Sequence, residues 1–129
     1  MSDKAKLYET LGELLYVIAM ADGVIQDEEK KVLQEITETH QWAHDIKWSF
    51  NYEESKKADV ENVYKKVIDF CHNYGPAPEY QEFIEAMNKL ASAAEGIDES
   101  ESMLINSFSR DLTERFRNDI ERKLNRDLD

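Results

Sequence analysis

The chain has 129 residues, of which 41% are hydrophobic and 34% charged, and its formal net charge is −12. This length fits one domain over residues 1–129, while the charge argues against nucleic acid and anionic membranes as partners, because both are bound through Lys and Arg. A single cysteine excludes an intrachain disulfide, and only four Gly and two Pro favour long helices over a sheet.

The first half of the chain predicts three helices. Apolar residues recur at helical spacing over residues 7–21, and Gly23 follows as a C-terminal stop. A second helix is expected to begin near residues 26–27. Large apolar side chains at spacing four over residues 42–50 predict a short third helix. The polar residues 51–58 are expected to form a loop.

The second half predicts three or four more helices. Asp59 is the expected N-cap of a fourth helix, which stops at Gly75. Pro78 fits the first turn of a fifth helix. A sixth is expected to begin after Asp98, and residues 112–128 place five apolar residues at spacing four. No stretch alternates long enough for a strand, so we predict an all-α, compact bundle of about six or seven helices.

Two short acidic loops resemble each other, over residues 21–29 and 94–101. Each has an acid before a glycine, an isoleucine soon after it, and a glutamate four residues past the isoleucine. Each loop follows one apolar helix pattern and precedes another, over residues 11–36 and 84–108. The chain is therefore predicted to contain an internal pseudo-duplication of a helix–acidic loop–helix unit.

The charges of these loops suit a cation. Asp22 and Glu95 follow helix C-termini, where a carboxylate is unfavourable, whereas Glu29 and Glu101 fall in the first turn of the next helix. A cation between the two loops would offset the unfavourable charge of Asp22 and Glu95. The ligands would be carboxylate and carbonyl oxygens, which Ca²⁺ and Mg²⁺ prefer. The alternative is structural: glycines as helix stops and glutamates as caps. An ordinary EF-hand is excluded because its first ligand would be Ile18.

The motif over residues 19–25 with Glu29, and its second copy over residues 94–97 with Glu101, resemble the TerB-like domain family. The resemblance covers roughly residues 7–108. That family is associated with bacterial tellurite resistance and phage defence, and also occurs beside DnaJ-like co-chaperones. The resemblance implies an all-helical, duplicated fold, a divalent-cation site and no established enzymatic reaction. On matching positions, the ligands are Asp22, Glu29, Glu95 and Glu101, with Glu28 and Asp98 as lesser candidates.

Other chemical signals are weak. His40 and His44 are four residues apart, but they fall at an expected helix break, so we expect solvated histidines and not a zinc pair. Cys71 lies on the inward face of its helix and is expected to be a buried structural residue. The C-terminal helix over residues 112–128 carries an apolar stripe, which we expect to pack on its own bundle, with a partner or weak homodimer seam as the alternative.

These observations predict a non-enzymatic domain. A cytoplasmic location is expected because no signal peptide or membrane-spanning stretch is found and the chain has one cysteine. We expect it to bind a divalent cation through its two acidic loops and to act as a stress-related sensor or scaffold with an unidentified protein partner. The alternative is a helical interaction module without a metal. A metal-dependent hydrolase is a third class, for which no base or nucleophile is evident.

Overall fold

The computed structural model describes residues 3–21, 23–93 and 99–128, and it contains six helices in these ranges and no strand. The prediction of an all-α bundle is confirmed. The residues expected to form a sixth and a seventh element make one long helix. The helices are α1 (Asp3–Ala19), α2 (Asp27–Thr37), α3 (Ala43–Lys56), α4 (Val60–Tyr74), α5 (Glu79–Ala91) and α6 (Glu99–Leu128).

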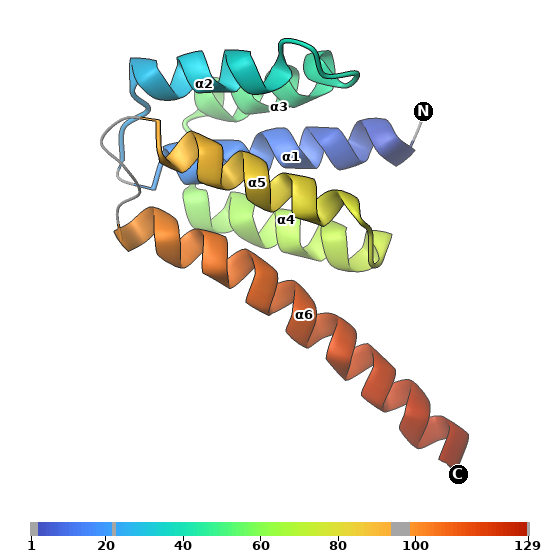
Figure 1. The fold of residues 1–129 in the computed structure, drawn as a ribbon. Coiled ribbons are helices and arrows are strands. Elements are labelled where there is room, and N and C mark those ends of the chain that lie inside the picture. The colour runs from blue at the N-terminus through green and yellow to red at the C-terminus, as the bar shows by residue number, and fades with distance from the viewer. Residues whose placement is uncertain (1–2, 22, 94–98, 129) are drawn as a thin grey trace.

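Helix α1 runs through the middle of the bundle, with the other helices around it (Figure 1). Eleven of its 17 residues are buried, and it packs mainly against α3, α4 and α5. The sequence explains this position, because α1 is apolar around most of its circumference, unlike the amphipathic helices that cover it. It approaches α3 closely at Gly12, which faces Ile46 and Ser49.

The predicted cap and stops of the fourth helix are confirmed. The carboxylate of Asp59 accepts a hydrogen bond from the backbone N–H of Asn62 at 3.0 Å, so Asp59 is the N-cap of α4. At the other end, Gly75 has a φ of 100°, a conformation that favours glycine.

This cap gives a simple test of stability. Replacing Asp59 by Ala removes the acceptor for one exposed N–H at the start of α4, and we expect a loss of about 1 kcal/mol in the free energy of unfolding. Chemical denaturation of the variant measures the loss. An Asp59→Asn variant, which keeps a side-chain oxygen, should lose much less, and equal losses in the two variants would contradict the capping role.

The loop predicted over residues 51–58 is wrong, because α3 continues to Lys56. The segment reads as polar, yet Glu53 points inward and is 2% exposed, where it pairs with Lys66 of α4 at 3.2 Å. A buried, paired glutamate looks like a loop residue in the sequence. The C-cap of the helix is Lys57, which has a left-handed backbone conformation with a φ of 52°.

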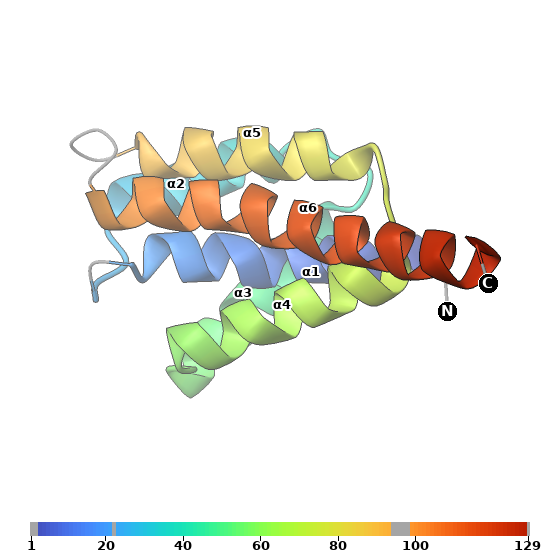
Figure 2. The same cartoon turned by 90° about the horizontal axis from the view of Figure 1, so that it is seen from below.

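Helix α6 lies along the bundle with its first half and leaves it with its second half (Figures 1 and 2). Phe108 and Leu112 are buried, whereas Ile120 and Leu124 are 60% and 56% exposed. The expectation that the whole apolar stripe packs on its own bundle is therefore wrong beyond Phe116, because the bundle ends there and α6 does not. None of the described helices has the length and apolar character that a membrane crossing requires.

Candidate cation site at one end of the bundle

The helix ends that flank the two acidic segments lie at the same end of the bundle. The C-termini of α1 and α5 and the N-termini of α2 and α6 all lie on the same side in both views (Figures 1 and 2). Three of the six predicted ligands, Asp22, Glu95 and Asp98, lie outside the described residues. Glu28, Glu29 and Glu101 are described, so they carry the geometry of the candidate site.

Glu29 is a buried carboxylate in the first turn of α2, with an exposed fraction of only 4%. Its Oε1 atom accepts a hydrogen bond from the backbone N–H of Gln26 at 2.9 Å. The neighbouring Glu28 is exposed to solvent. Glu29 therefore caps α2, as the structural alternative predicted, and the positive end of the helix favours its charge.

Glu101 holds the corresponding position at the start of α6, with an exposed fraction of 8%. Glu29 and Glu101 are 72 positions apart in the sequence, yet each is a buried carboxylate in the first turn of a helix at the same end of the bundle. Burying a carboxylate is costly unless the charge is paired or hydrogen-bonded. Glu29 and Glu101, the two predicted ligands in helix first turns, are therefore both buried carboxylates in the structure.

The first loop is a tight turn at its glycine. Gly23 has a φ of 93°, and its backbone N–H donates to the carbonyl of Met20 at 2.9 Å. A side chain at this position would be strained, so the prediction of Gly23 as a helix stop is confirmed. Within the described ranges, no group of three or more His, Cys, Asp and Glu side chains is placed to hold a metal ion.

A second polar cluster, which the sequence did not predict, joins α1, α5 and the turn before α3. Tyr8 donates its hydroxyl hydrogen to Glu82 Oε2 at 2.9 Å, and His40 Nε2 lies 2.6 Å from Glu82 Oε1. The N–H of Trp42 donates to His40 Nδ1 at 2.9 Å, so the ring hydrogen of a neutral His40 belongs on Nε2. The expectation of a solvated histidine is wrong for His40, because its ring pairs with Glu82. The sequence does not show this pairing, since Glu82 is 42 positions away.

This cluster borders an open hollow of about 460 Å³, which Lys4, Thr39 and Gln41 also line. Burial, together with the hydrogen bond to Glu82, raises the pKa of the Tyr8 hydroxyl. Both ring nitrogens of His40 are engaged, and both oxygens of Glu82 accept hydrogen bonds. The arrangement ties three segments together and leaves His40 no lone pair with which to act as a general base.

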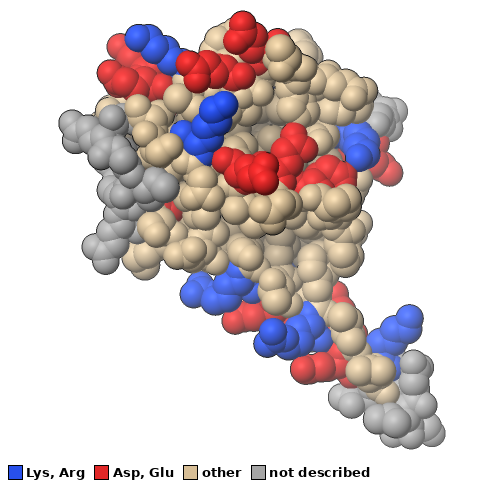
Figure 3. Space-filling model, in the orientation of Figure 1, with Lys and Arg blue, Asp and Glu red and all other residues tan. Residues whose placement is uncertain are grey.

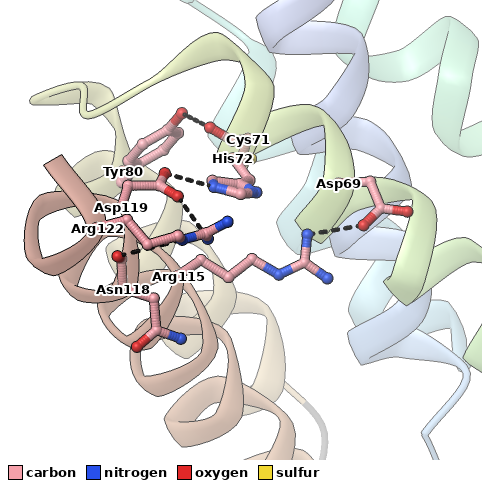
Figure 4. Close-up of polar contacts among 8 residues, drawn as sticks. All are labelled: Asp69, Cys71, His72, Tyr80, Arg115, Asn118, Asp119 and Arg122. Atoms are coloured by element: carbon pink, nitrogen blue, oxygen red, sulfur yellow. Dashed lines mark hydrogen bonds and ion pairs between the residues drawn. The ribbon is translucent and has the colours of Figure 1, made fainter. Parts of the chain in front are cut away.

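The prediction for Cys71 is confirmed, because its side chain is fully buried in the core. Burial raises the pKa of this thiol to about 12, which keeps it protonated and a poor nucleophile. The Tyr80 hydroxyl donates to the backbone carbonyl of Cys71 at 2.9 Å (Figure 4). The neighbouring His72 faces away from the core and contacts Asp119 of α6 at 2.7 Å.

One ionic cluster lies between α1, α3 and α4, with its two carboxylates mostly buried and its cation half exposed. Lys66 Nζ lies 3.1 Å from Glu13 Oε2 and 3.2 Å from Glu53 Oε1. The side chain of Glu53 is 3% exposed and that of Glu13 is 17% exposed, whereas Lys66 reaches solvent. Burial raises the pKa of the Glu13 carboxyl, and the charge of Lys66 opposes that rise.

The described geometry defines an all-helical bundle in which the helix ends that flank both acidic segments lie at one end. The model of the family described as "Tellurite resistance protein TerB" matches residues 14–113 of this chain. This match covers most of the chain, so the protein belongs to the TerB family, and the resemblance seen in the sequence is confirmed. No curated protein and no solved structure matches the chain.

Proposed function

We propose that this TerB-family chain is a non-enzymatic domain that binds a divalent cation between its two acidic loops. The observation that carries the proposal is the pair of buried carboxylates, Glu29 and Glu101, at equivalent positions of two helices that begin at the same end of the bundle. With Asp22 and Glu95 from the preceding helix ends, and with Glu28 and Asp98 nearby, the donor set consists of oxygen atoms. Such a set suits Ca²⁺ or Mg²⁺.

The same proposal includes a biological role as a sensor or scaffold in a stress response of the tellurite-resistance type, in the cytoplasm. The family match supports the role, and the one buried cysteine suits a reducing compartment. The engaged nitrogens of His40 argue against this residue as a general base, and the buried thiol of Cys71 argues against it as a nucleophile. A protein partner would bind the cation-bound and cation-free forms of the acidic end with different affinities.

Thermal melting tests the cation. A ligand that binds only the folded state adds about 2.7 kcal/mol at one hundred times its Kd, which corresponds to a rise of about 10 °C in Tm for a chain of this size. We expect Ca²⁺ or Mg²⁺ to raise the Tm, and an Asp22→Asn, Glu95→Gln double variant to lose most of that rise. Paramagnetic resonance of added Mn²⁺, read as loss of the free-ion signal, measures binding independently of stability.

A second variant isolates the buried carboxylates. Glu29→Gln with Glu101→Gln keeps the shape of both side chains, and a glutamine oxygen can still accept the hydrogen bond from Gln26. The expected result is weaker cation binding, with an apparent Kd at least about tenfold higher, equivalent to about 1.4 kcal/mol. The matched control is Glu35→Gln, an exposed acid on α2, which should respond as the wild type does.

The alternative function is a helical interaction module with no metal. The hydrogen bond from Gln26 to Glu29 favours it, because a capping glutamate is stable without a cation. Absence of any Tm rise with Ca²⁺, Mg²⁺ and Mn²⁺, with an unchanged Mn²⁺ signal, would establish this alternative. A hydrolytic activity that is lost on chelation would instead point to a metal-dependent hydrolase.

A further inference from the structure

The face of α6 that packs on the bundle continues beyond the point where the bundle ends. Leu112 is 5% exposed and Phe116 is half-buried, whereas Ile120 and Leu124 are more than half exposed. All four lie at spacing four, so they form one continuous ridge along the helix. The ridge therefore begins in the core and ends as an unpartnered apolar surface on the part of α6 that projects in Figure 1.

The contacts that hold α6 to α4 end at Asp119, immediately before this surface. Arg115 Nη1 lies 2.7 Å from Asp69 Oδ1, and His72 Nε2 lies 2.7 Å from Asp119 Oδ2 (Figure 4). Arg122 then pairs with Asp119 on its own helix at 3.0 Å. Beyond this point α6 is a short single helix, and such helices are marginally stable in water without a packing partner.

The charge of this projecting segment differs from that of the rest of the chain. Over residues 117–124 three cations stand against two acids, a net charge of +1, although the whole chain carries −12. Lys and Arg are interspersed with Asp and Glu along the projecting part of α6, whereas Asp and Glu predominate on the face of the bundle above it (Figure 3). Two copies of so acidic a chain repel each other, and this segment is where they can approach with least repulsion.

We propose that the projecting segments of two copies of this chain cross each other and cover their Ile120–Leu124 ridges mutually. Ridges at spacing four on both helices interdigitate with the helix axes crossing at about 50°. In a two-fold, antiparallel crossing centred near residue 122, Lys123 of one copy lies about 3 Å along the axis from Asp119 of the other. Lys123 has no ion-pair partner in the described part of its own chain.

The expected dimer is weak. Each copy contributes two exposed apolar side chains and the neighbouring turns of one helix, so the buried area falls below the roughly 1,200 Å² typical of stable complexes. An interface of this size corresponds to reversible association, with a Kd in the range of about 10 μM to about 1 mM. The contact is isologous, because the same ridge is presented by both copies, and it therefore closes as a dimer without forming longer assemblies.

Sedimentation equilibrium of the full chain from about 10 μM to about 1 mM tests the proposal, since this range brackets the expected Kd. We expect the average mass to rise from monomer towards dimer. Ile120→Glu with Leu124→Glu should raise the Kd at least about tenfold, while both changes are at exposed positions and leave the bundle folded. The matched control is Met103→Glu, which is 62% exposed on the same helix and should associate as the wild type does.

Spin labels test the arrangement. Labels at Glu121→Cys should lie within about 20 Å of each other in the dimer, and labels at Ser109→Cys more than about 30 Å apart, because antiparallel crossing separates positions far from residue 122. The native Cys71 is buried and does not react. Short distances at both positions would indicate a parallel pair and overturn the proposal.

Two outcomes of these measurements would contradict the proposal that a second copy of the chain covers the Ile120–Leu124 ridge. A wild-type chain that remains monomeric at the highest concentration overturns the proposal, as does a double variant that associates as strongly as the wild type. If the monomeric wild type binds polyglutamate, and the Ile120→Glu, Leu124→Glu variant does not, the ridge belongs to an acidic partner. Neither result depends on the cation, so failure here is distinguishable from failure of the proposed function.

Discussion

Replacing Lys66 by Met is expected to lower the free energy of unfolding by about 2 to 3 kcal/mol. Breaking a buried ion pair by removing one partner costs about 3 to 5 kcal/mol, and the partial exposure of Lys66 reduces this amount. The variant leaves Glu13 and Glu53 facing each other between three helices without their shared cation. Urea denaturation measures the loss, which corresponds to a fall of roughly 10 °C in Tm.

The pH dependence distinguishes lost charge from lost packing. The pKa of Glu13 in the folded state is raised above its ordinary value, so the native state binds more protons than the unfolded state between the two pKa values. Stability therefore falls as pH rises through this window, and the fall is larger without Lys66. The difference between wild type and Lys66→Met should be largest at neutral pH and should shrink as pH falls below the unfolded-state pKa of the glutamate.

Two controls accompany this prediction. Lys65→Met changes the neighbouring exposed lysine of α4, which has no ion pair in the described residues, and should cost little. Glu13→Gln in the Lys66→Met background removes one of the two facing carboxylates and should restore part of the stability. A Lys66→Met loss that equals that of Lys65→Met, or that stays constant with pH, would contradict an ionic role for the cluster.

The sequence predicted the features that local chemistry decides. The cap at Asp59 and the stops at Gly23 and Gly75 follow from residue types whose backbone and hydrogen-bonding preferences are strong. The capping position of Glu29 follows from its place in the first turn of α2. The all-helical class followed from apolar spacing, since helices dominate when that period persists and glycine and proline are few.

The sequence failed where a side chain meets a distant partner. Glu53 reads as a loop residue until Lys66, 13 positions away, is known to pair with it. His40 reads as solvated until Glu82, 42 positions away, is known to face it. The stripe from Leu112 to Leu124 shows which face of α6 is apolar, but the length of the bundle beneath it is a tertiary property.

The close approach of α1 and α3 at Gly12 gives the second large effect. A Cβ atom at this position would meet Ser49 Oγ and the backbone carbonyl of Ile46, both far inside contact distance. Gly12→Ala gains up to about 1 kcal/mol from helix propensity, whereas overpacking a rigid contact costs about 1 to 3 kcal/mol or more. Because a backbone atom is one of the two obstacles, we expect a net loss of at least about 2 kcal/mol.

Denaturation of paired variants separates the two obstacles. Ser49→Gly removes the hydroxyl that lies against Gly12, so the double variant Gly12→Ala, Ser49→Gly should recover part of the loss measured for Gly12→Ala relative to the Ser49→Gly background. Full recovery would show that the Ile46 carbonyl is not an obstacle, and a stabilised Gly12→Ala would contradict the close approach. In a folded Gly12→Ala variant, the added Cβ is expected to move α1 away from α3, because the Ile46 carbonyl belongs to the backbone of α3.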